Sequence, residues 1–124
     1  MAVDKHAVNE IVLFIRNDSQ LYRQQWTPIV LNYAKRKVKG TFNKQLAVKG
    51  VVNLVNTGIQ KYKREFGLQG AAEYGLSRVS METKQAAAKE LLGFMMEEIN
   101  ETAKDLKKLQ AAKEKAKKAP KKRK

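Results

Sequence analysis

Residues 48–66 read VKGVVNLVNTGIQKYKREF, and their apolar side chains repeat with the period of an α-helix. Valine is a mediocre helix former, but seven in-phase residues outweigh that propensity. We therefore predict a helix here, with Thr41 or Asn43 as its N-cap and Gly67 as its C-cap. The predicted buried stripe consists of Val48, Val51, Val52, Val55, Ile59, Tyr62 and Phe66.

Two earlier segments follow the same helical period. The first is a short helix, after which Asp18 or Ser19 can cap the next one. The second segment ends at Gly40 and contains Pro28, so either one helix kinks there or Thr27 caps a new helix; we favour the break. The predicted stripes are Val3, Ala7, Ile11 and Phe14, then Tyr22, Trp26, Ile29, Val30 and Tyr33.

A connector and one long helix complete the predicted fold. Residues 67–79 form the connector, with one turn around residues 71–74, and Ser80 caps the long helix. Helices joined by short polar links cover one another's apolar stripes, so we predict an all-α fold, a small bundle of about four helices. The stripe of the last helix is Ala88, Leu92, Met95, Ile99, Ala103 and Leu106.

Positive charge is concentrated at the end of the chain. The 124 residues hold 26 Lys and Arg against 12 Asp and Glu, a net charge of +14. Residues 1–102 carry +5 of this charge and residues 103–124 carry +9. From residue 111 nearly every side chain is Lys or Ala, which offers little to offset the entropy of ordering. We predict a helical bundle domain over residues 1–110 and a frayed helix end running into a disordered tail over residues 111–124.

The composition also predicts where the protein resides. It has no cysteine, and its longest apolar run, residues 11–15, is far shorter than the roughly 20 residues that span a bilayer. The first residues do not read as a signal peptide, so we expect a soluble, cytoplasmic protein. Residues 120–124 resemble a nuclear localisation signal, which would matter only in a eukaryotic source.

Side chains for catalysis or metal binding are sparse. His6 is the only histidine, so neither a metal-binding pair nor a Ser-His arrangement is expected. Glu97 and Glu101 stand one turn apart and could in principle hold a divalent cation, but a solvated acidic face is the plainer interpretation. We therefore predict no enzyme activity, no cofactor and no metal site.

The basic residues of the folded part suggest a binding surface. Lysines and amides project from the second segment on the side that the core does not need, where they could contact phosphates and base edges. The third segment adds basic residues and has no carboxylate between Gly40 and Glu65, while Gly50 and Thr57 are small enough to let a backbone approach. The predicted nucleic-acid-binding residues of this part are Gln24, Gln25, Lys35, Lys39, Lys49, Lys61 and Arg64.

The aromatic residues allow two interpretations. Tyr22, Trp26 and Tyr33 could stack on bases, as aromatic side chains do in single-strand binders. Their spacing fits the buried stripe, so we predict that they pack in the core. Tyr74 lies outside every stripe and is the freer candidate for stacking.

The tail is the part of the sequence that most strongly indicates nucleic-acid binding. Its cations would neutralise phosphates and release counterions without reading sequence. Its Lys-Ala-Pro composition is similar to the tails of linker histones and bacterial histone-like proteins. The predicted contacts are Lys113, Lys115, Lys117, Lys118, Lys121, Lys122, Arg123 and Lys124.

The first half of the chain also carries an unusual string of residues. The string begins with Leu21-Tyr22-Arg23-Gln24-Gln25. It continues with Pro28-Ile29, Asn32, Lys35, Lys39-Gly40-Thr41, Leu46-Ala47-Val48-Lys49, Tyr62 and Glu65-Phe66. This pattern resembles small, mostly uncharacterised proteins encoded by bacteriophages. The resemblance implies viral origin and no particular chemistry.

Three functions remain open from the sequence. The first is a phage accessory protein that coats or bridges DNA or RNA, largely independently of sequence. The alternative is a virion component, or an inhibitor that docks on a host protein with an acidic surface. The third, a basic helix on anionic membrane, is disfavoured because Glu90, Glu97 and Glu101 lie opposite the apolar stripe of the last helix.

Overall fold

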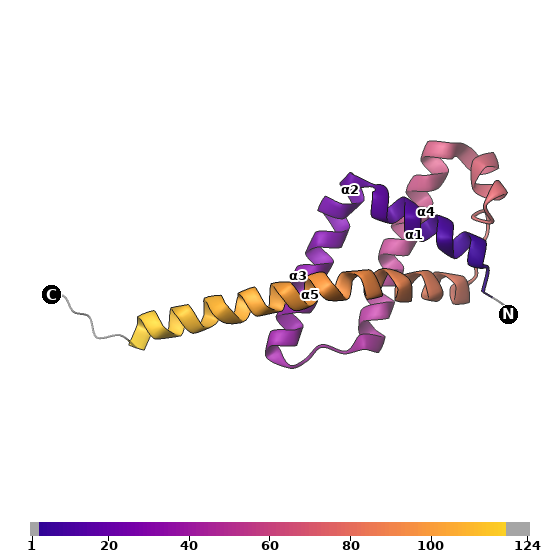
Figure 1. Cartoon of the computed structure of the whole chain (residues 1–124). Helices are drawn as coiled ribbons and strands as arrows, with labels where there is room; N and C mark the ends of the chain where they lie inside the picture. Colours follow the sequence, from indigo (N-terminus) through magenta and orange to yellow (C-terminus); the bar gives the residue numbers. More distant parts are fainter. Residues whose placement is uncertain (1–2, 119–124) are drawn as a thin grey trace.

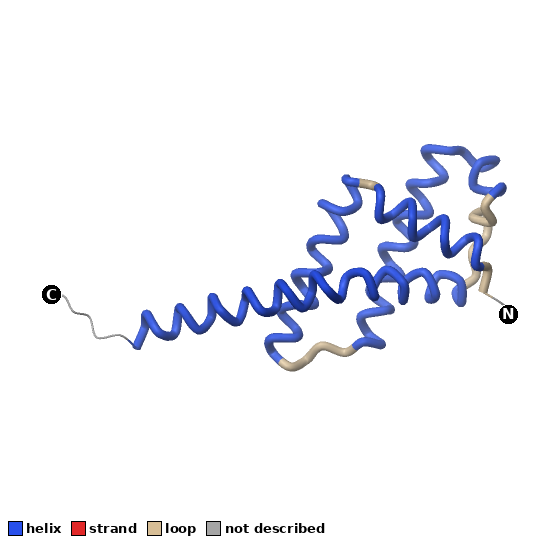
Figure 2. The backbone as a smooth tube through the Cα atoms, viewed as in Figure 1, coloured by secondary structure: helices blue, strands red, loops and turns tan. Residues whose placement is uncertain are grey.

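Helix α5 (Met81–Lys118) is the axis of the fold, and α1 (Lys5–Asn17), α3 (Thr27–Lys39) and α4 (Lys44–Glu73) all pack against it (Figure 1). Between α1 and α3 lie the short α2 (Ser19–Leu21) and the π-helix η1 (Tyr22–Trp26). The computed structural model describes residues 3–118, and every regular element in that range is a helix (Figure 2). The predicted small all-α bundle is confirmed.

Side-chain caps begin the main helices. Asp18, Asn43 and Ser80 accept hydrogen bonds from the backbone amides three residues ahead, at 2.9, 3.0 and 3.1 Å, as the sequence predicts. Asp4 caps α1 in the same way, accepting from the Ala7 amide at 3.1 Å. Each cap satisfies an amide that would otherwise lack a partner, so these residues set where the helices start.

Helix α4 buries a wider face than one stripe. Val51, Val55, Ile59 and Tyr62 are buried as predicted, whereas Phe66 is 55% exposed. The structure also buries Ala47, Leu54 and Gly58, which the stripe omits. The reason is that α4 packs against both α1 and α5.

Pro28 does not break the second helix, contrary to our prediction. Trp26 and Thr27 both have right-handed helical backbone angles, and the Thr27 amide donates to the Tyr22 carbonyl, five residues back. Thr27 is therefore not an N-cap. Because a proline ring clashes with the carbonyl four residues before it, the wider π-turn of η1 accommodates Pro28 without ending the helix.

Gly67 interrupts α4 at the predicted C-cap. Its φ of +77° is unfavourable for residues with a side chain, and the helical angles before it end there. A second helical segment then continues to Glu73, so the predicted connector contains more helix than the single turn expected at residues 71–74.

Helix α5 continues well past the bundle (Figure 1). We call residues 107–118 the α5 extension, because every side chain from Lys107 to Ala116 is exposed. The helix end predicted at the start of the tail extends over residues 111–118. The remaining tail residues, 119–124, lie outside the described part of the chain.

Candidate nucleic-acid interface

A long part of the fold has no acidic residue. Between Asp18 and Glu65 the sequence contains ten Lys and Arg and neither Asp nor Glu. This segment forms η1, α3 and most of α4. Its basic side chains therefore have no carboxylate within the segment. Any side chain that forms an ion pair with them must belong to another part of the chain.

The structure brings three predicted residues together. Lys35 and Lys39 from α3 line one pocket with Lys113 from the α5 extension. We call this the α3/α5 pocket; its volume is about 270 Å³ and its apolar part comes from Val38, Leu106 and Leu109. No carboxylate lines it, and within the described residues none of the three lysines forms an ion pair. Three ammonium groups are thus free to bind an anion.

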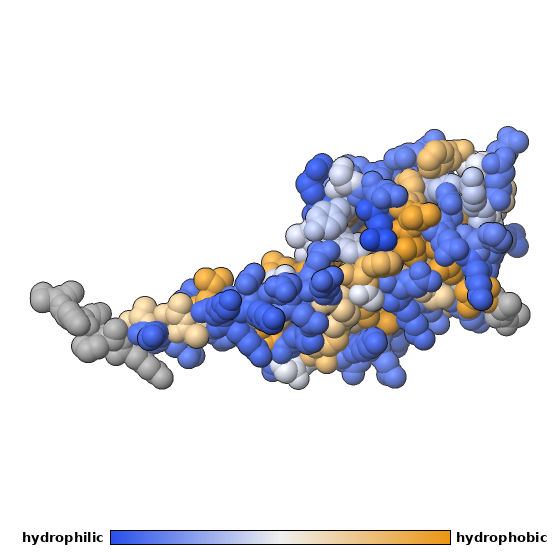
Figure 3. Space-filling model, in the orientation of Figure 1, coloured by the Kyte–Doolittle hydropathy of each residue, from blue (hydrophilic) through white to orange (hydrophobic). Residues whose placement is uncertain are grey.

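The α5 extension continues this positive surface away from the bundle. It contains six lysines and one carboxylate, that of Glu114. Lys115 is exposed, and Lys117 and Lys118 belong to the same helix. Figure 3 shows hydrophilic side chains along much of this part of α5. Lys121, Lys122, Arg123 and Lys124, which are also predicted to bind, lie outside the described residues.

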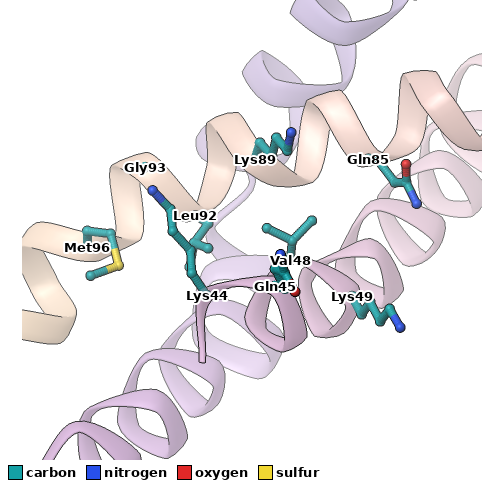
Figure 4. A pocket seen from close by; sticks show the side chains of 9 residues that line it. All are labelled: Lys44, Gln45, Val48, Lys49, Gln85, Lys89, Leu92, Gly93 and Met96. Atoms are coloured by element: carbon teal, nitrogen blue, oxygen red, sulfur yellow. The ribbon is translucent and has the colours of Figure 1, made fainter. Parts of the chain in front are cut away.

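Lys49 belongs to a different site. It lines a pocket of about 690 Å³ between the start of α4 and the first half of α5, together with Lys44 and Lys89 (Figure 4). We call this the α4/α5 pocket. Lys35 and Lys39 of α3 and Lys49 of α4 are therefore divided between two pockets, both of which involve α5.

Lys61, which is also predicted to bind, already has partners within the chain. Its ammonium group lies 2.8 Å from the Asp18 carboxylate and donates to the Gln20 amide oxygen at 2.7 Å. Burial by itself would raise the pKa of Asp18, but hydrogen bonds from Lys61 and the Leu21 amide outweigh it, so this pKa lies below its ordinary value of 3.8. Lys61 thus joins α4 to the α1–α2 corner.

The other predicted residues are not gathered with Lys35. Gln24 is exposed and Gln25 is half-buried on η1, and neither lines the α3/α5 pocket. Arg64 is exposed near the end of the first part of α4. Gly50 is predicted to admit a nucleic-acid backbone, but a Cβ there would collide with the Tyr33 hydroxyl, so its small size serves internal packing.

The aromatic residues divide as the stripe predicts, with one exception. Trp26 and Tyr33 are buried, which confirms their core role, but Tyr22 is 43% exposed. Tyr22 stacks on Trp26, and both donate to the Glu98 carboxylate at 3.2 Å. The charge of Glu98, then burial, raises the pKa of Tyr22. Tyr74 is exposed and packs edge-on against Tyr62.

Clusters of metal-ligating side chains and membrane-spanning helices are both absent from residues 3–118. Among residues 3–118, no three His, Asp or Glu side chains gather where they could hold a metal ion. No helix in that range is long and apolar enough to cross a bilayer. No family model, curated protein or solved structure matches the chain. The function is therefore inferred from the residues of the chain itself.

Proposed function

We propose that the protein is a non-enzymatic nucleic-acid-binding protein whose α3/α5 pocket and α5 extension contact the phosphate backbone. The observation that carries this proposal is the meeting of Lys35, Lys39 and Lys113, which come from distant parts of the sequence, without a carboxylate among them. Lysine binds phosphate as a point charge on a flexible stem, so this arrangement favours backbone contact over base recognition.

The α3/α5 pocket and the α5 extension have different roles in the proposed interface. Lys35 and Lys39 are held by α3 within the bundle and fix how the protein lies on the nucleic acid, and Lys113 joins them from the α5 extension. The α5 extension supplies most of the remaining charge on one helix, with a rise of about 1.5 Å per residue. Its lysines release counterions wherever they meet phosphates, so binding is largely independent of sequence.

The biological setting is part of the proposal. The resemblance of roughly the first half of the chain to phage-encoded proteins supports a viral accessory protein that coats or bridges DNA or RNA. Such a protein would act in the cytoplasm of the infected host, where both nucleic acids are present.

The test compares two triple variants with equal loss of charge. One is Lys35→Gln/Lys39→Gln/Lys113→Gln, and the control is Lys5→Gln/Arg78→Gln/Lys84→Gln near the opposite end of α5. We expect the first to weaken binding to a duplex of about 20 base pairs at least tenfold more than the control does, measured by fluorescence anisotropy. Equal losses in both variants would mean that net charge, and not this pocket, determines binding.

A further inference from the structure

The α4/α5 pocket combines positive charge with a large apolar floor. Its floor is apolar, formed by Val48 from α4 and by Leu92 and Met96 from α5 (Figure 4). Lys44, Lys49 and Lys89 surround this floor, and no carboxylate lines the pocket. The α3/α5 pocket also combines lysines with apolar side chains, but the α4/α5 pocket is larger, about 690 Å³ against about 270 Å³, so it has room for an occupant that covers the apolar floor as well as meeting the lysines. The pocket therefore suits an occupant that is both apolar and acidic.

Gly93 is the second feature that points to an occupant. It lies in the middle of α5 and lines the pocket, where glycine costs about 1 kcal/mol relative to alanine. A Cβ at Gly93 would meet no atom within 4 Å, so packing within the chain does not require glycine there. At Gly58, in contrast, a Cβ would come within 2.6 Å of the Ile15 side chain. The backbone at Gly93 is open to a close approach from outside.

The shape of the pocket indicates what approaches. Its α5 side extends from Gln85 to Met96, which is roughly 16 Å at 1.5 Å per residue, and its other side is the first turns of α4. Two adjacent helices form a trough of this kind for a third helix, whose apolar stripe covers the floor. Its flanking carboxylates would then meet the lysines at the rim.

We infer that the α4/α5 pocket binds an acidic amphipathic helix of a partner protein. The net charge of +14 opposes docking of a second copy of this chain, so the partner is a different, acidic polypeptide. This inference does not depend on nucleic-acid binding, because the α3/α5 pocket uses other lysines.

The test uses three synthetic helical peptides of about 14 residues with a fluorescent label. One has a leucine stripe flanked by glutamates, the second has the same stripe flanked by lysines, and the third has serines in place of the leucines. We expect the leucine-glutamate peptide to bind the full chain at least about tenfold more tightly than either of the others. Fluorescence anisotropy measures the three affinities.

Two variants show whether the peptide occupies this pocket. Gly93→Leu fills the open space on the floor and should weaken binding of the leucine-glutamate peptide about tenfold while leaving DNA affinity unchanged. Lys44→Glu/Lys49→Glu should reverse the preference towards the lysine-flanked peptide, whereas the control Lys5→Glu/Lys84→Glu should not. This reversal does not depend on how Gly93→Leu folds.

Several results would overturn the inference. Equal binding of the serine peptide would show attraction by charge alone, and binding unaffected by Gly93→Leu would place the peptide elsewhere. Absence of binding by the leucine-glutamate peptide would also exclude an acidic helix as the occupant. A dimer that Gly93→Leu dissociates, observed by sedimentation, would identify a second copy instead. The DNA affinity of the Lys35→Gln/Lys39→Gln/Lys113→Gln variant tests the proposed function separately, so failure of one proposal can be distinguished from failure of the other.

Discussion

At the scale of single residues, Lys61 has a structural role that can be separated from binding. Its ammonium group holds Asp18 and Gln20, and both ends of the Lys61–Asp18 pair are mostly buried. Lys61→Met keeps the aliphatic stem but leaves the Asp18 carboxylate without this partner. We expect the free energy of unfolding at pH 7 to fall by about 1–3 kcal/mol, measured by urea denaturation.

The free energy of unfolding at acid pH tests the same Lys61–Asp18 contact. Because the pKa of Asp18 is lower in the folded state, its stabilisation is present above its ordinary pKa of 3.8 and disappears as the pH falls through the folded value. The difference between wild type and Lys61→Met should therefore shrink in strong acid. If Lys61→Met is as stable as wild type yet binds DNA much more weakly than Lys84→Met, then Lys61 belongs to the interface.

Replacement of a helical glycine by alanine should have opposite effects on stability at Gly93 and at Gly58. Gly93→Ala should stabilise the protein by up to about 1 kcal/mol, because alanine is the better helix former and nothing lies within 4 Å of the new methyl group. Gly58→Ala should destabilise it, because the methyl group would collide with Ile15. Thermal unfolding of the two variants measures both effects, and destabilisation by Gly93→Ala would show that the pocket floor is closed.

At the scale of elements, the α5 extension should contribute little to the stability of the bundle. Every side chain from Lys107 to Ala116 is exposed, and an isolated basic helix of this length is only marginally stable. A chain that ends at Gln110 should keep its thermal midpoint within about 2 °C and bind nucleic acid more weakly. Circular dichroism and anisotropy provide the two measurements. A large fall in the midpoint would mean that residues 111–124 stabilise the bundle.

Elements with local signals could be predicted from the sequence, and elements that depend on distant contacts could not. The caps Asp18, Asn43 and Ser80 and the stripe of α4 follow from spacing within one segment. The π-turn before Pro28 could not be predicted, because the same residues allow a break, a kink or a wider turn. Composition does not show how far α5 continues into residues 111–118, because it carries no information about continuity with a buried helix.

In the candidate site, too, contacts between distant parts of the chain could not be predicted from the sequence. Lys35, Lys39 and Lys113 can be predicted individually, but only the packing of α3 against α5 brings them together. Lys61 and Asp18 are 43 residues apart, so no helical period reveals their ion pair. The sequence does not group Lys44 and Lys89 with Lys49, since their relation depends on how α4 crosses α5.

At the scale of the whole molecule, α5 separates the positive surface into two regions of different character. The α3/α5 pocket is small, about 270 Å³, and continues into a lysine-rich helix, whereas the α4/α5 pocket is larger, about 690 Å³, and lies against the first half of α5. Charge on the first region suits an extended polyanion, and charge on the second suits a compact acidic partner. One small bundle could therefore link a nucleic acid to a protein.

The salt dependence of DNA binding measures how many phosphates the α3/α5 pocket neutralises. We predict a linear fall of log K with log salt for the wild type. The slope should be shallower for Lys35→Gln/Lys39→Gln/Lys113→Gln by up to about 2.7, at roughly 0.9 for each phosphate that the variant no longer neutralises, with little change for the Lys5, Arg78 and Lys84 control. A wild-type affinity that does not change with salt, or equal slopes for both triple variants, would contradict phosphate binding by the α3/α5 pocket.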